Sequence, residues 1–442
     1  MKHGVQVAAR TNRKQLSVET RNTPLVRPTM NAKPFRQTVI LCRHAISKLM
    51  KHLFFAVVFT CSNSVVANAH SPRIECDEML LERARKRIQT RQEPFWTYWQ
   101  ATRPERESAL ATKPQPYVGS DSLKFHAAAQ DQGIAARLLV YEWRLEGSEQ
   151  SGTQAVELLL RWAEATTMTG TQFDPEIRFP NSGMDVARGM LPFVAAYDLL
   201  DGHAALTDEN RRTIETWFRS LANVVKEGIR RWEDNDNFGG QGFQNHHAAH
   251  ALGLVLFGAA LRDDELIEFA IDSPNNPRDF QELIAGLILM PGEKPHGGLR
   301  NKPLHAGEIQ DRHRTTGGAG LTYCHLSLTI MLYTAEILTR VTGDDWVNYR
   351  APGGECLQLS ATFYSDFFRL RNARINGDYY FRDQRAIQNN ASYLGTFEVA
   401  LHHWPDVPNL RAIVRSINRA RTPRSWLCYY GLPLLTHGVT KP

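Results

Sequence analysis

LTYCHLSLTIMLYTAEILTRV, residues 321–341, is the stretch that most clearly indicates the fold of this chain. Its apolar residues recur at three- and four-residue spacing, which is typical of one face of an α-helix. Gly343 follows at the place where such a helix would end. The same spacing recurs in five other stretches, 133–145, 152–166, 185–200, 209–230 and 248–261. The sequence therefore predicts an all-α fold.

Polar, glycine-rich segments separate the predicted helices, and the longest are 170–183, 233–244 and 291–320. Loops of that length inside a compact domain are usually functional or disordered. Alternating strand patterns are rare, although 372–382 favours a short hairpin around Asn376-Gly377. No linker-like change of composition divides residues 70–442. We therefore expect one domain of antiparallel helix pairs, and such pairs can close into an (α/α) toroid or barrel.

Composition and charge exclude several classes of protein. The 442 residues are 42% apolar and 22% charged, so the chain is too apolar to be disordered and long enough for a large core. The formal charge is +6, but residues 1–69 hold eleven Lys/Arg and one acid. The remaining 373 residues carry 41 basic and 45 acidic side chains, a net of −4. The net positive charge of the whole chain thus gives no reason to expect a nucleic-acid partner. The longest uninterrupted apolar run is too short for a membrane span.

The first 69 residues have the pattern of a leader. Residues 50–69 begin with a short basic segment, continue with the apolar run 53–59 and end with Ala67-Asn68-Ala69, the small-residue cleavage pattern of a signal peptide. Residues 1–49 lack periodicity, so we expect an upstream extension with Met50 as the true initiator. The mature protein would begin near His70 and be periplasmic or secreted. A buried helix is the alternative for residues 50–69.

Four cysteines follow the leader, and their wide separation excludes a compact CxxC metal site; they are Cys76, Cys324, Cys356 and Cys428. Export permits disulfides, but a domain of this size has core enough without them. We favour free buried thiols, above all for Cys324.

The first candidate site is Gln244-Asn245-His246-His247-Ala248-Ala249-His250, where a glycine-rich loop meets a predicted helix. Three interpretations stay open. Asn245 and His246 could form a catalytic pair. His246 and His250, four residues apart, could bind a metal, although the Glu of an HExxH motif is missing. Finally, Asn245 could cap the helix while the histidines pack in the core.

The second candidate site runs from Asp311 to Tyr323, from a basic segment through a glycine cluster into a helix. Tyr323 falls in the first helical turn. The positive end of the helix dipole and a neighbouring arginine, Arg312 or Arg314, would favour a phenolate and so suit base chemistry. The alternative is that Tyr323 is a core aromatic residue and the arginines are solvated.

These motifs resemble a known family. Residues 321–328 resemble the Leu-His-Tyr-His helix of the alginate lyases that adopt an (α/α) toroid, and Asn245-His246 resembles their Asn-Asn-His motif, with Gln244 in place of the first Asn. Residues 185–200 are similar to a helix that recurs in that superfamily. Two features differ: Ala248-Ala249 replaces an aromatic pair, and the family arginine nearer the tyrosine has no counterpart. The chain thus resembles a divergent relative, near the alginate- and glucuronan-cleaving lyases.

The resemblance implies a polysaccharide lyase that cleaves a 1,4-linked polyuronate by β-elimination, with mannuronate-type linkages of alginate favoured and glucuronan as the alternative. Tyr323 would act as base and then as acid, while Asn245, His246 and Arg314 neutralise the C5 carboxylate. For guluronate, where H5 and O4 lie on opposite faces, His246 would be the base. The resemblance implies no cofactor and no metal.

The expected partner is an anionic polysaccharide, with neither nucleic acid nor a membrane beyond export. Further polar and aromatic side chains are candidates for binding it, although solvent exposure or core packing explains each equally well. They are Arg312, His247, Arg188, Lys124, Gln244, His313, Tyr379 and Tyr380.

Two other functions are compatible with the sequence. A glycoside hydrolase would need two facing carboxylates, for which Asp311 with Glu308, or Asp234 with Asp236, are the candidate pairs. A non-catalytic glycan-binding protein would need no base at all. A lyase creates a conjugated double bond that absorbs in the near ultraviolet, and a hydrolase does not. Tyr323→Phe would leave the function of a binding protein intact, whereas a lyase would lose turnover and largely keep binding.

Overall fold

The computed structural model describes residues 71–166, 173, 181–235, 242–294, 305–314, 320–369, 374–375, 378–379, 394–416, 419 and 429–440. The chain divides into two units, Met1–Ala67 and Asn68–Pro442, and every described residue belongs to the second. The expected upstream extension (1–49) and signal peptide (50–69) therefore lie outside the described residues and stay predictions.

The described residues of the second unit are mainly helical with almost no sheet, which confirms the predicted fold class. Its helices are α2 (Glu78–Gln89), α3 (Phe95–Ala101), α4 (Arg103–Leu110), α5 (Ser122–Glu146), α6 (Glu149–Ala165), α8 (Ser182–Leu199), α9 (Asp208–Glu233), α10 (Asn245–Leu261), α11 (Asp264–Ile271), α12 (Phe280–Leu287), α13 (Asp311–Arg314), α14 (Gly320–Thr342), α15 (Leu357–Arg369), α17 (Gly395–His403), α18 (Pro408–Ser416) and α19 (Pro433–Thr436). All six stretches with helical spacing are helices.

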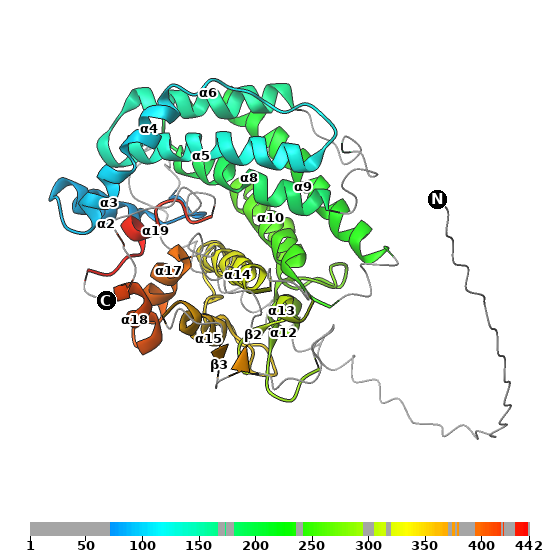
Figure 1. The fold of residues 1–442 in the computed structure, drawn as a ribbon. Coiled ribbons are helices and arrows are strands. Elements are labelled where there is room, and N and C mark those ends of the chain that lie inside the picture. Colours follow the sequence, from blue (N-terminus) through cyan, green and yellow to red (C-terminus); the bar gives the residue numbers. More distant parts are fainter. Residues whose placement is uncertain are drawn as a thin grey trace, which may run out of the picture. The chain divides into compact units, whose positions relative to one another are not determined.

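The helices form a closed ring. Helices α5, α8, α10 and α14 pack against one another in this order (Figure 1), and α6, α9, α11 and α12 pack on them. From α14 the contacts continue through α17 and α19 to α2, which packs on α5. The last helix of the chain thus meets the first described helix, and the ring closes into the expected (α/α) toroid.

Local capping residues determine where these helices begin. The Asp121 side chain accepts hydrogen bonds from the backbone N–H groups of Leu123 and Lys124, so α5 begins at Ser122 and not near residue 133, where apolar spacing first indicates it. The first turns of α5 are rich in alanine and polar residues, which hides their periodicity. The helix ends at Gly147, whose φ of 78° suits a residue without a Cβ.

Two glycines allow the inner helices to approach closely. A Cβ on Gly189 of α8 would lie 2.8 Å from the Cα of His126 on α5, and one on Gly253 of α10 would lie 2.7 Å from the Cβ of Ala187. Real side chains do not tolerate such contacts. The absence of a side chain at these two positions therefore sets the spacing of α5, α8 and α10.

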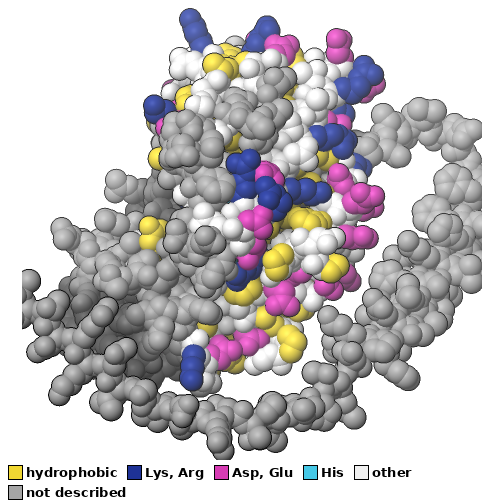
Figure 2. Space-filling view, turned by 90° about the vertical axis from the view of Figure 1, so that its right-hand side faces the viewer, with side chains coloured by type: hydrophobic (Ala, Val, Ile, Leu, Met, Phe, Trp, Pro, Cys, Tyr) yellow, Lys and Arg dark blue, Asp and Glu magenta, His cyan; other side chains and the backbone are white. Residues whose placement is uncertain are grey.

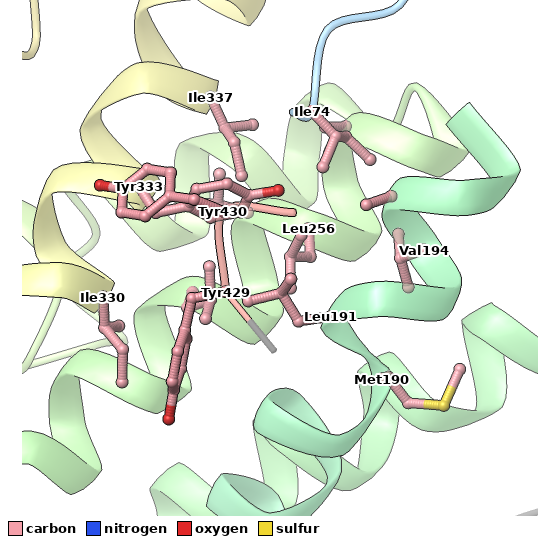
Figure 3. Close-up of a cluster of buried hydrophobic side chains, with 14 of the residues drawn as sticks. Ile74, Met190, Leu191, Val194, Leu256, Ile330, Tyr333, Ile337, Tyr429 and Tyr430 are labelled. Carbon is pink, nitrogen blue, oxygen red and sulfur yellow. The ribbon is translucent and has the colours of Figure 1, made fainter. Parts of the chain in front are cut away.

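Helix α14 is the centre of the core. Ile330, Tyr333 and Ile337 on this helix are fully buried and belong to a cluster of apolar side chains that includes residues of α8, α10 and both ends of the described chain (Figure 3). Among the described helices, α14 alone is long and apolar enough to cross a membrane, but 89% of that window is buried inside the fold. It is therefore a core helix of the toroid.

The predicted loop 291–320 contains regular structure and is in that respect wrong. Strand β1 (Ile288–Leu289) pairs antiparallel with β2 (Glu308–Ile309), and α13 follows directly. The expected hairpin is confirmed, because β3 (Arg374–Ile375) pairs antiparallel with β4 (Asp378–Tyr379). Cys76, Cys324 and Cys356 are free and buried, as expected, while Cys428 lies outside the described residues.

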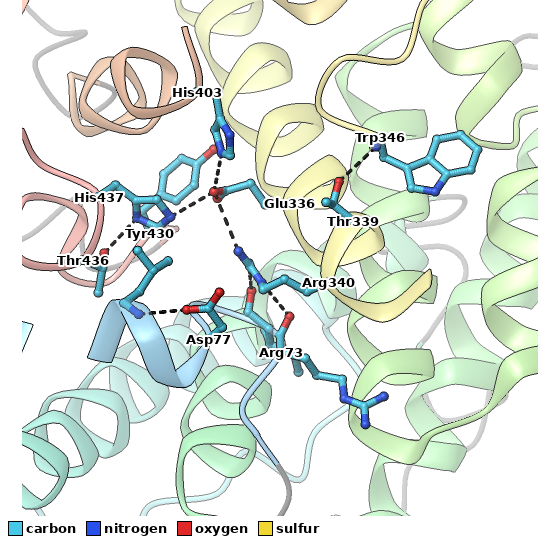
Figure 4. Close-up of polar contacts among 12 residues, drawn as sticks. Arg73, Asp77, Glu336, Thr339, Arg340, Trp346, His403, Tyr430, Thr436 and His437 are labelled. Atoms are coloured by element: carbon cyan, nitrogen blue, oxygen red, sulfur yellow. Dashed lines mark hydrogen bonds and ion pairs between the residues drawn. The ribbon is translucent and has the colours of Figure 1, made fainter. Parts of the chain in front are cut away.

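A buried carboxylate near the C-terminal end of α14 joins both ends of the described chain. Glu336 lies 2.8 Å from His403 Nε2, 2.9 Å from His437 Nε2 and 3.8 Å from an Arg340 guanidinium nitrogen (Figure 4). Arg340 in turn donates to the carbonyl oxygens of Arg73 and Ile74. Although burial raises the pKa of Glu336, the two histidines and Arg340 hold it well below its usual range. The N-terminal segment, α14 and the C-terminal segment are therefore held together by one ionic network.

We expect Glu336→Gln to lower the free energy of unfolding by about 3 kcal/mol at pH 7, because the substitution removes one partner of a buried ionic network. The folded-state pKa of Glu336 is depressed, so its contribution is complete above the unfolded-state pKa of about 4.3 and is lost as the pH falls through the folded value. Denaturant titrations of the wild type and of Glu336→Gln from pH 7 to pH 3 should show a difference in the free energy of unfolding that shrinks below about pH 4.3. Glu157→Gln, which breaks an exposed pair with Arg161, is the control and should change stability little. Equal effects of the two substitutions would contradict the role of Glu336.

Candidate active site

The beginning of α10 is held by a capping box. The backbone N–H of Gln244 donates to His247 Nδ1 at 3.1 Å, and the Gln244 side chain accepts from the backbone of His247. Because Nδ1 accepts, the ring proton of neutral His247 is on Nε2, which lies 3.6 Å from Glu233. Arg278 donates to the same carboxylate at 3.0 Å. Burial lowers the pKa of His247, in keeping with the neutral form.

Gln244 and His247 are each only 1% exposed, and they bond to each other in the capping box, so these mutual bonds favour a structural role over contact with substrate. Their assignment as substrate ligands stays a prediction. The capping residue is Gln244 and not Asn245, which is the first residue of the helix. The sequence-based alternative of a cap at Asn245 is therefore wrong by one position, and this leaves the Asn245 side chain for another role.

His246 is half-buried beside Trp232, the fully buried indole at the end of α9. The two ring centroids are 4.6 Å apart at an interplanar angle of 60°. His250, one turn later, is buried with its Nε2 facing Gly183 and Gly228, and burial lowers its pKa to about 3. In the described part of the chain, no group of three His, Cys, Asp or Glu side chains could hold a metal ion. The geometry therefore favours a packing role for His250. His246 lies at the edge of the site.

Asp311 connects the two candidate motifs. Its side chain is fully buried, and one oxygen accepts from Asn245 Nδ2 at 3.0 Å while the other accepts from Ser327 Oγ at 2.6 Å. Asn245 is the first residue of α10, and Ser327 lies in α14. One carboxylate therefore joins the first residue of α10 to the N-terminal half of α14.

Tyr323 occupies the first turn of α14, as predicted, and is half-buried at the edge of the core. It precedes Ser327 by four residues, so both side chains lie on the same face of the helix. The segment before α13 is fixed to this region, because Ile309 N–H donates to the Tyr364 hydroxyl and the Cys324 thiol to the Ile309 carbonyl. The phenol, the amide of Asn245 and the ring of His246 therefore belong to one end of the paired helices α10 and α14.

The carboxylates considered for a hydrolase are engaged elsewhere. Glu308 is fully buried and accepts from the backbone N–H of His305 at 2.7 Å, and Asp311 holds Asn245 and Ser327. Asp234 pairs with Arg230 on the surface, and Asp236 lies outside the described residues. A hydrolase needs a protonated acid and an accessible base. Neither Glu308 nor Asp311 is accessible, so this pair is wrong as a hydrolase centre.

The other predicted substrate ligands are dispersed. Arg188 on α8 donates to the Tyr429 hydroxyl at 3.1 Å, Lys124 is exposed in the first turn of α5, and Arg312 is buried on α13 at 3% exposure. Lys124 belongs to a different part of the ring from the Asp311 network. The side chains of His313, Arg314 and Tyr379, and the whole of Tyr380, lie outside the described residues.

Comparison with known proteins identifies the family. The family model described as "Alginate lyase" matches residues 84–374. The chain belongs to the alginate lyase family. The fold is similar to that of an alginate lyase from Bacteroides ovatus (12% identity, TM-score 0.59, covering 84% of this chain and 100% of that one). It is also similar to alginate lyase A1-III from Sphingomonas species A1 (13% identity, TM-score 0.54, 84% and 97% covered) and to a variant of A1-III complexed with tetrasaccharide (14%, 0.53, 84% and 96%). No curated protein sequence is significantly similar to the chain.

Three residues that build the site of this alginate lyase family member have no role that the sequence predicts. Asp311 appears in the sequence only as the start of the second motif and as a candidate hydrolase carboxylate, and nothing in the sequence marks Ser327 or Trp232 as site residues. Helical spacing between Tyr323 and Ser327 is visible in the sequence, but the pairing of Asp311 with Asn245 spans 66 residues and no local pattern signals it. Trp232, at the end of α9, meets His246 only because α9 and α10 pack side by side.

We expect His247→Ala to lower the free energy of unfolding by about 1–2 kcal/mol, because the capping box that begins α10 would be lost. His246→Ala, at the adjacent half-buried position, is the matched control and should change stability less while it lowers turnover. Denaturant unfolding and steady-state kinetics would measure both effects. A His247→Ala protein of unchanged stability but raised KM would instead assign this ring to substrate binding.

Proposed function

We propose that this protein cleaves a 1,4-linked polyuronate by β-elimination, with Tyr323 as base and acid and with Asn245 and His246 at the substrate carboxylate. The observation that carries the proposal is the Asp311 bridge, which joins Asn245 to the α14 face that bears Tyr323. Membership of the alginate lyase family supports the reaction class. The burial of Glu308 and Asp311 supports a lyase over a hydrolase.

The chemistry explains why these groups suit the reaction. The C5 proton lies next to a charged carboxylate and is barely acidic until that charge is neutralised. An amide N–H and an imidazole can donate to the carboxylate oxygens and stabilise the enediolate-like state, as an oxyanion hole does. The phenolate of Tyr323 would then take H5 and return a proton to O4 as the C4–O4 bond breaks. In mannuronate and glucuronate both groups lie on one side of the ring, so one tyrosine suffices.

Mannuronate-type alginate is the favoured substrate in this proposal, with glucuronan as the second candidate. Such a chain carries one carboxylate on each sugar, so cations must come close to it. Over the described part of the face in Figure 2, Lys and Arg side chains are interspersed with Asp and Glu. Arg314 on α13 is the candidate cation of this proposal, since Arg312 is buried at 3% exposure and Arg188 donates to the Tyr429 hydroxyl.

The test is incubation of the purified protein with poly-mannuronate, poly-guluronate, glucuronan and hyaluronan while near-ultraviolet absorbance is followed. We expect a rise with poly-mannuronate or glucuronan, and Tyr323→Phe should lower kcat by about 10²–10⁴-fold while substrate binding is largely kept. Phe retains the ring, so any loss reports on the hydroxyl. No rise on any of the four polymers would defeat the proposal, and full activity of Tyr323→Phe would defeat the assigned base.

We also propose that the protein is exported after cleavage before His70. The first described residue, Ser71, is exposed, and the chain is anchored from Arg73 onward, where the N–H groups of Arg73 and Ile74 donate to Asp198 at 2.8 Å. Removal of residues 1–69 would leave these anchors in place.

Expression of the full chain in a Gram-negative host should yield a periplasmic or secreted protein. Its intact mass should correspond to a chain that begins at His70. Substitution Ala69→Arg should block cleavage, because signal peptidase requires a small residue there. A start at Met50 should give the same mature protein, which controls for the upstream extension. Cytoplasmic protein that keeps residues 50–69 would contradict the proposal.

A further inference from the structure

We infer that Asp311 is a positioning residue that fixes the amide of Asn245 toward the substrate and sets its place relative to Tyr323. The inference rests on the proposed function for its kinetic consequences, but the geometry that supports it is independent of the substrate. It begins with the burial of Asp311, which is 0% exposed and thus removed from water.

In the structure the group of Asn245 that faces Asp311 is the NH₂ and not the carbonyl, and both carboxylate oxygens act as acceptors. The distance of 3.0 Å between Asn245 Nδ2 and the Asp311 oxygen fits such a bond. The contact therefore selects one of the two orientations of the amide. One N–H is directed to Asp311, and we assign the second N–H of the same nitrogen, on a side chain that is 2% exposed, to a carboxylate of the substrate.

The second oxygen of Asp311 accepts from Ser327 Oγ at 2.6 Å, a short bond of the charge-assisted kind. Ser327 is one helical turn after Tyr323 on the same face. The carboxylate therefore links the amide of one helix to the helix that bears the phenol. A shift of Asp311 would change the separation of the two groups that must act on one sugar ring, and small misplacements of catalytic groups cost much of the rate.

Asp311 itself is fully buried and is assigned no contact with the substrate. The adjacent Arg312 is also buried, at 3% exposure, so this part of α13 is a supporting layer beneath the site. Substitution Asp311→Asn keeps the shape but replaces an obligate acceptor by an amide that can present either a donor or an acceptor. The orientation of Asn245 would then no longer be fixed.

The kinetic test is a double-mutant cycle in the full-length protein on the polymer that the wild type cleaves. Asp311→Asn should lower kcat by about 10–100-fold with little change in KM, and Asn245→Ala by about 10²–10³-fold. The double variant should be no slower than Asn245→Ala, because Asp311 acts through that amide. Ser327→Ala, which removes the other bond to Asp311, is the matched control and should reduce kcat less. Additive losses in the double variant would overturn the inference, as would a fall in kcat that tracks thermal stability alone across the variants.

A second measurement does not depend on turnover. In protein labelled with ¹⁵N-asparagine, the side-chain NH₂ signals of Asn245, identified by their loss in Asn245→Ala, should be slow to exchange with solvent. Asp311→Asn should shift these signals and speed their exchange, whereas the exposed-site substitution Glu157→Gln should leave them unchanged. If Asp311→Asn changed neither the positions nor the exchange rates of these signals, the inference would be overturned. An inactive wild type whose Asn245 signals respond to Asp311→Asn would defeat the proposed function but leave the positioning role intact.

Discussion

The buried carboxylate of Asp311 is the constraint on which the site depends. A carboxyl group with 0% exposure is costly unless its oxygens are satisfied, and here an amide from α10 and a hydroxyl from α14 satisfy them. Those partners must therefore come together whenever the chain is folded. The interactions that stabilise the fold therefore also bring together two motifs that lie 66 residues apart in the sequence.

A second buried carboxylate, Glu336, lies on the same helix as Ser327 but about 14 Å further along its axis, at 1.5 Å per residue. Its partners are His403, His437 and Arg340, which attach the two ends of the described chain to α14. Helix α14 thus carries one polar network near each end with an apolar stretch between them. The first network arranges side chains of the site, and the second closes the ring. Because the two networks share one rigid helix, closure of the ring also fixes the position of the site residues on α14.

Helical spacing was sufficient to predict the fold class, since six stretches of three- and four-residue periodicity all correspond to helices. It failed where local chemistry outweighs apolar pattern: α5 begins eleven residues earlier than its periodicity indicates, because Asp121 caps a polar, alanine-rich start. The motifs around Asn245 and Tyr323 were recognisable because each is contiguous. The role of Asp311 was not, because a carboxylate in a loop has the same sequence pattern whether it is an acid catalyst, a solvated charge or a buried bridge.

The burial of Asp311 also bears on how such a site tolerates divergence. Identity to the similar solved structures is only 12–14%, yet the toroid is retained. A ring of helices can exchange most of its apolar side chains for others of similar volume at small cost. A buried carboxyl group with two hydrogen-bond partners cannot be exchanged one residue at a time, since each single loss leaves an unsatisfied group. Polar networks of this kind should therefore change as units, and Asp311, Asn245 and Ser327 form such a unit here.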